Sequence, residues 1–200
     1  MSIIDKFVGK NLKKDEKAFN KIRVYEIVLS ILFIIVGVVI FMNKMISDNA
    51  VANVLGILII LEAIINIYSA VMPNSNSLYK SNLIFGILYI IVAIFMFTNI
   101  IKFINYLPIY YGVYIIINGL KTLLLSVNLL RIKDESFLVI LVMSLLIIAV
   151  GNLLLFYPFG SFSSLELVAV FSILIGIINA SYSNLLKKRA KKIISKVDSE

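Results

Sequence analysis

The sequence predicts an all-α membrane protein whose six transmembrane helices form three repeated helical hairpins. Hydrophobic residues make up 61% of the 200 residues and charged residues only 15%, whereas about a quarter of the residues of an average globular domain are charged. The apolar residues gather in six runs, each close to the roughly 20 residues with which a helix crosses the hydrocarbon core of a bilayer. The alternation of apolar and polar residues that is typical of a transmembrane barrel is not found. We therefore expect helices, whose backbone hydrogen bonds are satisfied within each span.

The boundaries of the six runs carry signals expected where a chain leaves lipid. The first run follows a polar segment, residues 1–23, and lacks a small-residue cleavage site, so we expect it to remain as a signal anchor. The turn-forming sequence PNSNSLYK separates the second and third runs. The fourth begins at Pro108, whose missing N–H costs little in a first helical turn. The fifth ends at Tyr157-Pro158-Phe159-Gly160, which suits a membrane interface followed by a turn. The six predicted spans are Val24–Met42, Val51–Met72, Asn82–Ile101, Pro108–Val127, Phe137–Tyr157 and Ser164–Leu186.

Small residues recur at matching places and group the spans into hairpins 24–72, 82–127 and 137–186 of one membrane domain, residues 24–186. Small side chains let neighbouring helix backbones approach closely. The first helix of each hairpin carries two small residues seven apart, and the second carries a polar residue followed by a small one. The first set is Ser30…Gly37, Gly86…Ala93 and Ser144…Gly151, and the second is Glu62-Ala63, Asn118-Gly119 and Asn179-Ala180.

The basic residues predict the topology and the partners of the two ends. Of the 19 Lys and Arg residues, only Lys44 and Lys102 fall on the side opposite the termini. The positive-inside rule therefore places both ends in the cytoplasm. We expect the protein in the inner (plasma) membrane of the cell. Residues 1–23 are expected to form a basic amphipathic helix lying on that membrane surface. The basic tail, residues 187–200, is expected to bind anionic lipid headgroups. Binding to nucleic acid is not expected, because neither segment interleaves aromatic residues suited to stacking on bases. A homo-oligomer remains an open alternative.

Four polar residues inside the predicted spans form the candidate intramembrane site: Glu62, Asn118, Lys121 and Asn179. An ionisable residue in mid-membrane is a functional candidate. Glu62 either ties helices together as a neutral or paired group, or handles a proton or ion. Lys121 lies on the same helix face as Asn118 and about one turn nearer the cytoplasm than Glu62, so it either pairs with Glu62 or extends to the interface.

The remaining acidic residues of the spans and the absence of two residue types bear on whether the chain is an enzyme. Glu26 and Glu166 lie near helix ends and are expected at the interface, with Glu166 in the first turn of its helix. The chain contains no His and no Cys, which removes the commonest general base and the commonest metal ligands. We therefore predict no catalytic, metal or cofactor residues, and no enzyme.

The repeats resemble the HdeD-type acid-resistance membrane proteins, whose unit is a short repeat domain of unknown function. The resemblance rests on a small-residue helix that ends near L-x-x-P-F, followed by a second helix with a polar-small pair. Ser144–Ala180, with GNLLLFYPFGS and ILIGIINAS, is the clearest copy, and the first two copies have Met42-Asn43 and Thr98-Asn99 where it has the proline. The resemblance implies a six-helix inner-membrane protein linked to acid or envelope stress, and it implies no site residues. A small transporter or channel with a path around Glu62 is the alternative.

Overall fold

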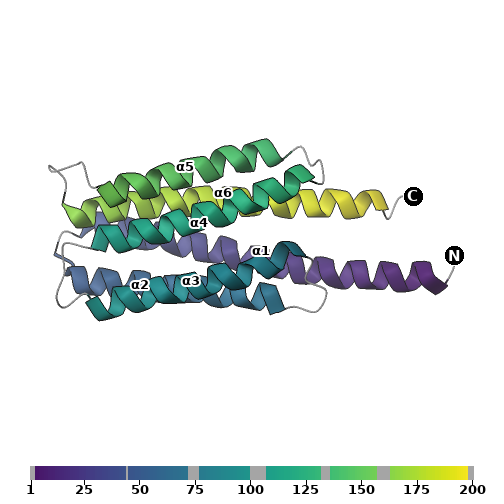
Figure 1. Ribbon diagram of the computed structural model, residues 1–200, viewed down its shortest axis with the longest axis horizontal. Helices are drawn as coiled ribbons and strands as arrows, with labels where there is room; N and C mark the ends of the chain where they lie inside the picture. The colour runs from purple at the N-terminus through teal and green to yellow at the C-terminus, as the bar shows by residue number, and fades with distance from the viewer. Residues whose placement is uncertain are drawn as a thin grey trace.

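The computed structural model describes residues 3–43, 45–71, 77–99, 107–131, 136–156 and 163–197. These residues form six helices and no strand, and each helix contains a segment long and apolar enough to cross a membrane. The helices run side by side in an elongated bundle with both termini at the same end, here called the terminal end; the opposite end is the far end (Figure 1). The predicted six-helix membrane fold is therefore confirmed. The helices are α1 (Ile3–Met42), α2 (Asp48–Val71), α3 (Ser77–Asn99), α4 (Leu107–Arg131), α5 (Phe137–Phe156) and α6 (Ser164–Val197).

The helix beginnings follow from local capping chemistry. Ser163 Oγ accepts a hydrogen bond from the Glu166 amide at 3.2 Å, and the Ser163 amide donates to Glu166 Oε2 at 3.3 Å. This reciprocal pair is a capping box, which satisfies N–H groups that the first turn of a helix leaves free. Glu166 thus lies in the first turn of α6, as predicted. The turn expected at residues 157–160 and the two lysines at 44 and 102 lie outside the described residues.

The amino-terminal basic segment differs from the sequence prediction. Residues 3–23 do not form a separate helix on the membrane surface, because α1 runs without interruption from Ile3 to Met42. Residues 187–197 likewise continue α6 to Val197. Both segments lack proline, and extending an existing helix by a residue costs far less than nucleating a new one. The ends therefore project beyond the bundle in line with their spans (Figure 1).

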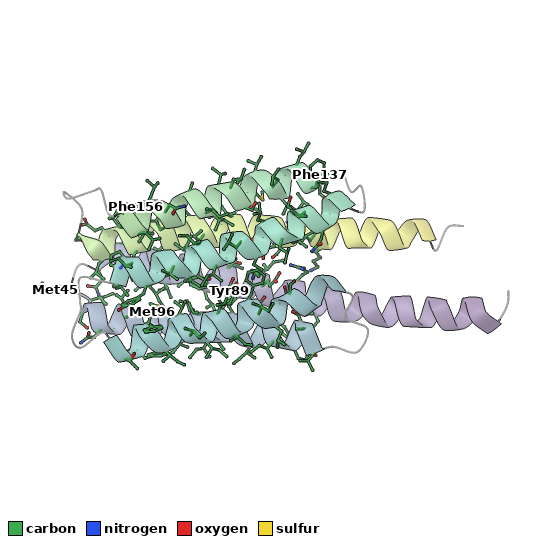
Figure 2. All side chains as sticks on the ribbon, in the orientation of Figure 1. Met45, Tyr89, Met96, Phe137 and Phe156 are labelled. Atoms are coloured by element: carbon green, nitrogen blue, oxygen red, sulfur yellow. The ribbon has the colours of Figure 1, made fainter. Side chains whose placement is uncertain are left out.

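The outer surface of the bundle is apolar and its centre is aromatic. Large side chains such as Phe156, which is 80% exposed, point away from the bundle (Figure 2). Tyr89, Met96 and Tyr114 are fully buried between the helices. Apolar side chains facing outward are stable in lipid rather than in water, so the exposed surface agrees with a multi-pass membrane protein.

The tightest helix packing joins consecutive hairpins: α2 with α3, α4 with α5, and α6 with α1. A Cβ added at Gly86 of α3 would lie 2.6 Å from Ile67 Cγ1 of α2, and one at Gly151 of α5 would lie 2.6 Å from Ile116 Cγ1 of α4. A Cβ at Gly37 of α1 would lie 2.7 Å from the Ala169 carbonyl oxygen of α6. The small residues noted in the sequence therefore lie in all three of these interfaces, and the α6–α1 contact closes the ring.

These contacts also fix the register of the three copies. Gly119 of α4 packs against Ile148, and Gly176 of α6 packs against Ile34. Ile148 and Ile34 are equivalent, because each follows the first small residue of its own helix by four positions. Gly176, and not the predicted Ala180, is therefore the third-copy counterpart of Gly119.

The predicted polar-small pair Asn179-Ala180 is thus wrong in register by four residues. The position before the small residue is polar in two copies and apolar in the third: Glu62, Asn118 and Ile175. Asn179 lies about one turn nearer the terminal end, at the position of Asn66 and Thr122. The sequence alone does not separate Gly176 from Ala180, because both are small residues of α6 and only their packing partners distinguish them.

Candidate functional site

A buried ion pair joins α2 to α4. Lys121 Nζ lies 2.9 Å from Glu62 Oε1, and the two side chains are 9% and 6% exposed. Both helices run from the far end to the terminal end, which places Lys121 about one turn further along than Glu62, within reach of its carboxylate. Lys121 therefore binds Glu62 inside the bundle and does not extend to the interface. Each charge is compensated by the other, whereas an isolated charge in hydrocarbon would have no counter-charge.

Tyrosines complete the surroundings of the pair. The Tyr114 hydroxyl donates a hydrogen bond to Glu62 Oε2, so both carboxylate oxygens have partners. Tyr89 of α3 presents its ring 5.5 Å from Lys121 Nζ, a cation–π contact. Sequence reasoning missed both residues. Tyr114 could have been found, because it precedes Lys121 by seven residues and so shares its helix face.

An aromatic layer separates the ion pair from the far end of the bundle. The Tyr114 ring stacks with Phe33 of α1 at 5.7 Å and with Tyr111 at 5.6 Å between ring centroids. The Tyr111 and Ser172 hydroxyl groups lie 2.9 Å apart and link α4 to α6. All four side chains are at most 1% exposed. This layer packs the interior on the far side of Glu62 with large rings.

A second ion pair lies nearer the terminal end. Arg23 and Glu26 of α1 contact each other, and the Ser183 hydroxyl of α6 donates to Glu26 Oε2 at 2.9 Å. The Arg23 and Glu26 side chains are 6% and 12% exposed. Glu26, expected at the interface, is therefore held between α1 and α6 by partners that the sequence analysis did not predict. The equivalent residue of α3 is Asn82, which makes a neutral hydrogen bond to Ser69 at 2.8 Å.

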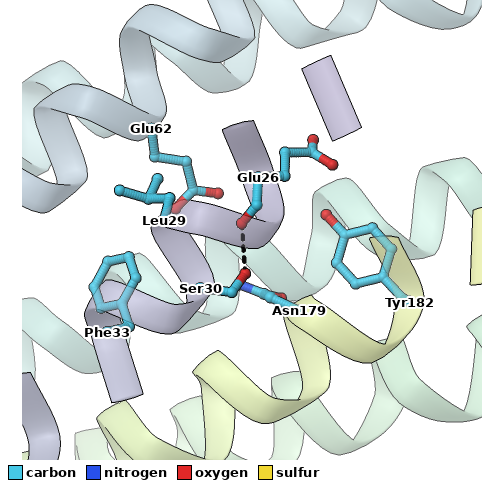
Figure 3. A pocket seen from close by; sticks show the side chains of 7 residues that line it. All are labelled: Glu26, Leu29, Ser30, Phe33, Glu62, Asn179 and Tyr182. Carbon is cyan, nitrogen blue, oxygen red and sulfur yellow. Dashed lines mark hydrogen bonds between the residues drawn. The ribbon is translucent and has the colours of Figure 1, made fainter. Parts of the chain in front are cut away.

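A small cavity of about 10 Å³ lies between the two ion pairs (Figure 3). One acid from each pair, Glu26 and Glu62, lines it together with polar and apolar residues. The lining residues are Glu26, Leu29, Ser30, Phe33, Glu62, Asn179 and Tyr182. A cavity of this size has room for about one water molecule.

The four predicted site residues do not form one cluster. Glu62 and Lys121 are paired, and Glu62 and Asn179 line the cavity. The Asn179 Oδ1 atom has no hydrogen-bond partner among the described residues. Asn118 is fully buried on α4, and neither atom of its amide has a partner in the same described segments. The site is therefore built from Glu62, Lys121 and Tyr114, with Asn179 on its terminal side.

The chemistry open to this site involves protons and small neutral molecules. Its two carboxylates are balanced by one lysine and one arginine, so its net charge is zero when all four groups are ionised. No group of three or more acidic, His or Cys residues that could hold a metal ion occurs in the part of the chain that the structure describes. Carboxylates beside hydroxyls and a free amide oxygen are groups that exchange protons or bind water.

A family model for a short repeat of unknown function (DUF308) matches residues 28–98 and 84–156. Together the two matches span more than half of the chain. The chain belongs to the DUF308 family. HdeD-type proteins are members of the same family. Each DUF308 match starts in the first helix of one hairpin and ends with the first helix of the next, so each contains one of the tight pairs, α2–α3 or α4–α5. No curated protein and no solved structure shows significant similarity to the chain.

Proposed function

We propose that this DUF308 protein is a non-enzymatic, HdeD-type protein of the bacterial inner membrane that supports tolerance to acid or envelope stress. The Glu62–Lys121 ion pair is the observation that carries the proposal, because it joins two helices through a charge that acid removes. Protonation of Glu62 would leave the Lys121 ammonium buried without its counter-charge, which is costly. The packing of α2 against α4 would then depend on the proton concentration that reaches Glu62.

The proposed orientation places both termini in the cytoplasm. The predicted topology puts all but two of the 19 basic residues on the side of the termini, and the positive-inside rule then makes that side cytoplasmic. The helical extensions of α1 and α6 carry most of these charges and would meet the anionic headgroups of the inner leaflet. The partners we propose are the bilayer and its anionic lipids, with a second copy of the chain as an alternative partner and without nucleic acid.

A deletion strain tests the proposal. We expect the strain to survive acid shock and membrane-perturbing stress less well than its parent, and expect the wild-type gene to restore survival. Glu62→Gln, which cannot lose or gain the carboxyl proton, should fail to restore survival under acid although the protein reaches the membrane. Glu166→Gln is the matched control, since Glu166 lies in the capping box of α6, away from the ion pair. Equal survival of deletion strain and parent under every stress would refute the proposal.

A path for protons or ions around Glu62 is the second candidate. The cavity beside Glu62 and the unpartnered Asn179 oxygen favour it, because transport requires polar groups that are not already occupied. The experiment is proton and cation flux into liposomes that contain the purified chain, measured for the wild type, Glu62→Gln and Glu166→Gln. Flux that only Glu62→Gln abolishes would establish a path. Flux equal to that of empty liposomes would exclude one.

A further inference from the structure

We infer that the cavity between Glu26 and Glu62 is a hydration site, in which one water molecule links the two ion pairs and passes protons between their carboxylates. The inference deepens the proposed function and rests on it for its physiological meaning. The sequence does not reveal this site, because its lining comes from α1, α2 and α6, whose contributing residues are far apart in the chain.

The cavity offers a water molecule both room and partners. Its volume of about 10 Å³ is close to the minimum that holds one water, which needs two to four polar neighbours. Asn179 lines the cavity and is 6% exposed, and its Oδ1 atom has no hydrogen-bond partner among the described residues. The Ser30 hydroxyl already donates to the Glu26 carbonyl at 2.7 Å, so it presents its lone pairs as an acceptor (Figure 3). A water molecule can donate one hydrogen bond to each of these two acceptors.

The charges around the cavity favour a neutral ligand. Glu62 is engaged by Lys121 and Tyr114, and Glu26 by Arg23 and Ser183. A metal cation here would be repelled by two cationic side chains, and an anion by two carboxylates. Water meets neither penalty.

The inferred water provides a route for protons that starts at Glu26. Glu26 is the more exposed of the two acids, at 12% of its side chain against 6% for Glu62. In one transfer, a protonated Glu26 carboxyl gives its proton to the water oxygen as the water gives another proton to the Glu62 carboxylate. Glu26 becomes ionised, Glu62 becomes neutral, and the water is regenerated.

The route ends at Glu62. The groups that face Glu62 from the neighbouring helices are Lys121 and Tyr114 of α4, Tyr89 of α3 and the cavity itself, beyond which lie the α1 pair Arg23–Glu26 and Tyr182 of α6. On the far side, Phe33, Tyr111 and Tyr114 fill the interior with stacked rings. The arrangement therefore takes up a proton from the terminal end and does not carry it across the membrane.

Infrared difference spectroscopy in light and heavy-oxygen water tests the inference on the full chain in lipid nanodiscs. The wild type should show an O–H stretching band of an ordered water that shifts in H₂¹⁸O. Asn179→Leu removes the free acceptor and fills the cavity, so it should abolish the band. Asn152→Leu is the matched control and should keep it, since the Asn152 amide is exposed on α5 and donates to the Ile148 carbonyl of its own helix. Absence of an isotope-sensitive band in the wild type, or its persistence in folded Asn179→Leu, would overturn the inference.

A second variant and two further outcomes keep the test decisive. Glu26→Gln should shift the water band and slow the protonation of Glu62 after a pH jump at least tenfold, whether or not Asn179→Leu folds. An unchanged band and an unchanged rate in Glu26→Gln would contradict the link. A band that sodium or potassium ions displace would show a cation site and also contradict it. A missing band together with an acid-sensitive deletion strain would reject the water molecule and leave the proposed function standing. A band that is present together with a deletion strain that survives acid as well as its parent would reject the proposed function alone.

Discussion

Lys121→Met removes the positive partner of Glu62 while keeping a side chain of similar length. Both charges are at most 9% exposed and lie 2.9 Å apart, so the substitution leaves a carboxylate in the bundle without its counter-charge. Breaking a buried ion pair in this way costs about 3–5 kcal/mol. Because the cost comes from the unpaired charge, Glu62→Gln combined with Lys121→Met should recover most of the stability that either single substitution loses.

Reversible unfolding in mixed detergent micelles measures this cycle. We expect each single variant to lose about 3–5 kcal/mol of the free energy of unfolding, and a coupling of at least about 2 kcal/mol in the double variant. Lys21→Met is the control, since Lys21 is exposed and its ammonium lies 5.8 Å from the Tyr25 ring; it should lose less than about 1 kcal/mol. Additive losses in the cycle, or a Lys121→Met variant as stable as Lys21→Met, would refute the reasoning.

Three further substitutions test other parts of the structure by the same unfolding measurement. Gly176→Leu should destabilise the protein by about 1–3 kcal/mol or more, because even a Cβ there would lie 2.6 Å from atoms of α1. Ala180→Leu, at a half-buried position, should be tolerated. A larger loss in Ala180→Leu than in Gly176→Leu would contradict the register. Tyr114→Phe should cost about 1.5–3 kcal/mol through the lost hydrogen bond to a charged group, and equal losses in Tyr114→Phe and Tyr110→Phe would argue against that bond. Ser163→Ala should cost about 1 kcal/mol by removing the cap of α6, and an unchanged stability would show that the cap contributes nothing.

The spans could be predicted from sequence because bilayer thickness sets their length directly. The Glu62–Lys121 pair was also within reach, since charges in lipid have few partners and these two helices run in the same direction. The partners of Glu26 were not predictable, because Ser183 lies 157 residues away in sequence and only the closing α6–α1 contact brings it near. Tyr114 was missed for a different reason: a buried tyrosine in a membrane helix looks like any other aromatic residue until its hydroxyl finds an acceptor.

The register of the third copy shows a limit of pattern reading in membrane helices. Lipid-facing and core-facing positions of these helices are both apolar, so hydrophobicity does not separate one face from the other. Gly176 and Ala180 are four residues apart and lie on nearly the same face of α6. Only the neighbours of Gly176 on α1 show which of them makes the close contact. The amino-terminal segment was predicted wrongly for a similar reason, because amphipathic composition suits both a surface helix and an extension of a span.

One measurement addresses the central claim, that Glu62 takes up a proton from the terminal side of a closed bundle. The chain is reconstituted into liposomes in a single known orientation, and either the inside or the outside is acidified while the carboxyl band of Glu62 and the internal pH are followed. We predict that the band changes only when the side of the termini is acidified, that Glu62→Gln removes the change, and that no net proton flux accompanies it. A response to acid on the opposite side, or proton flux that Glu62→Gln abolishes, would contradict the account.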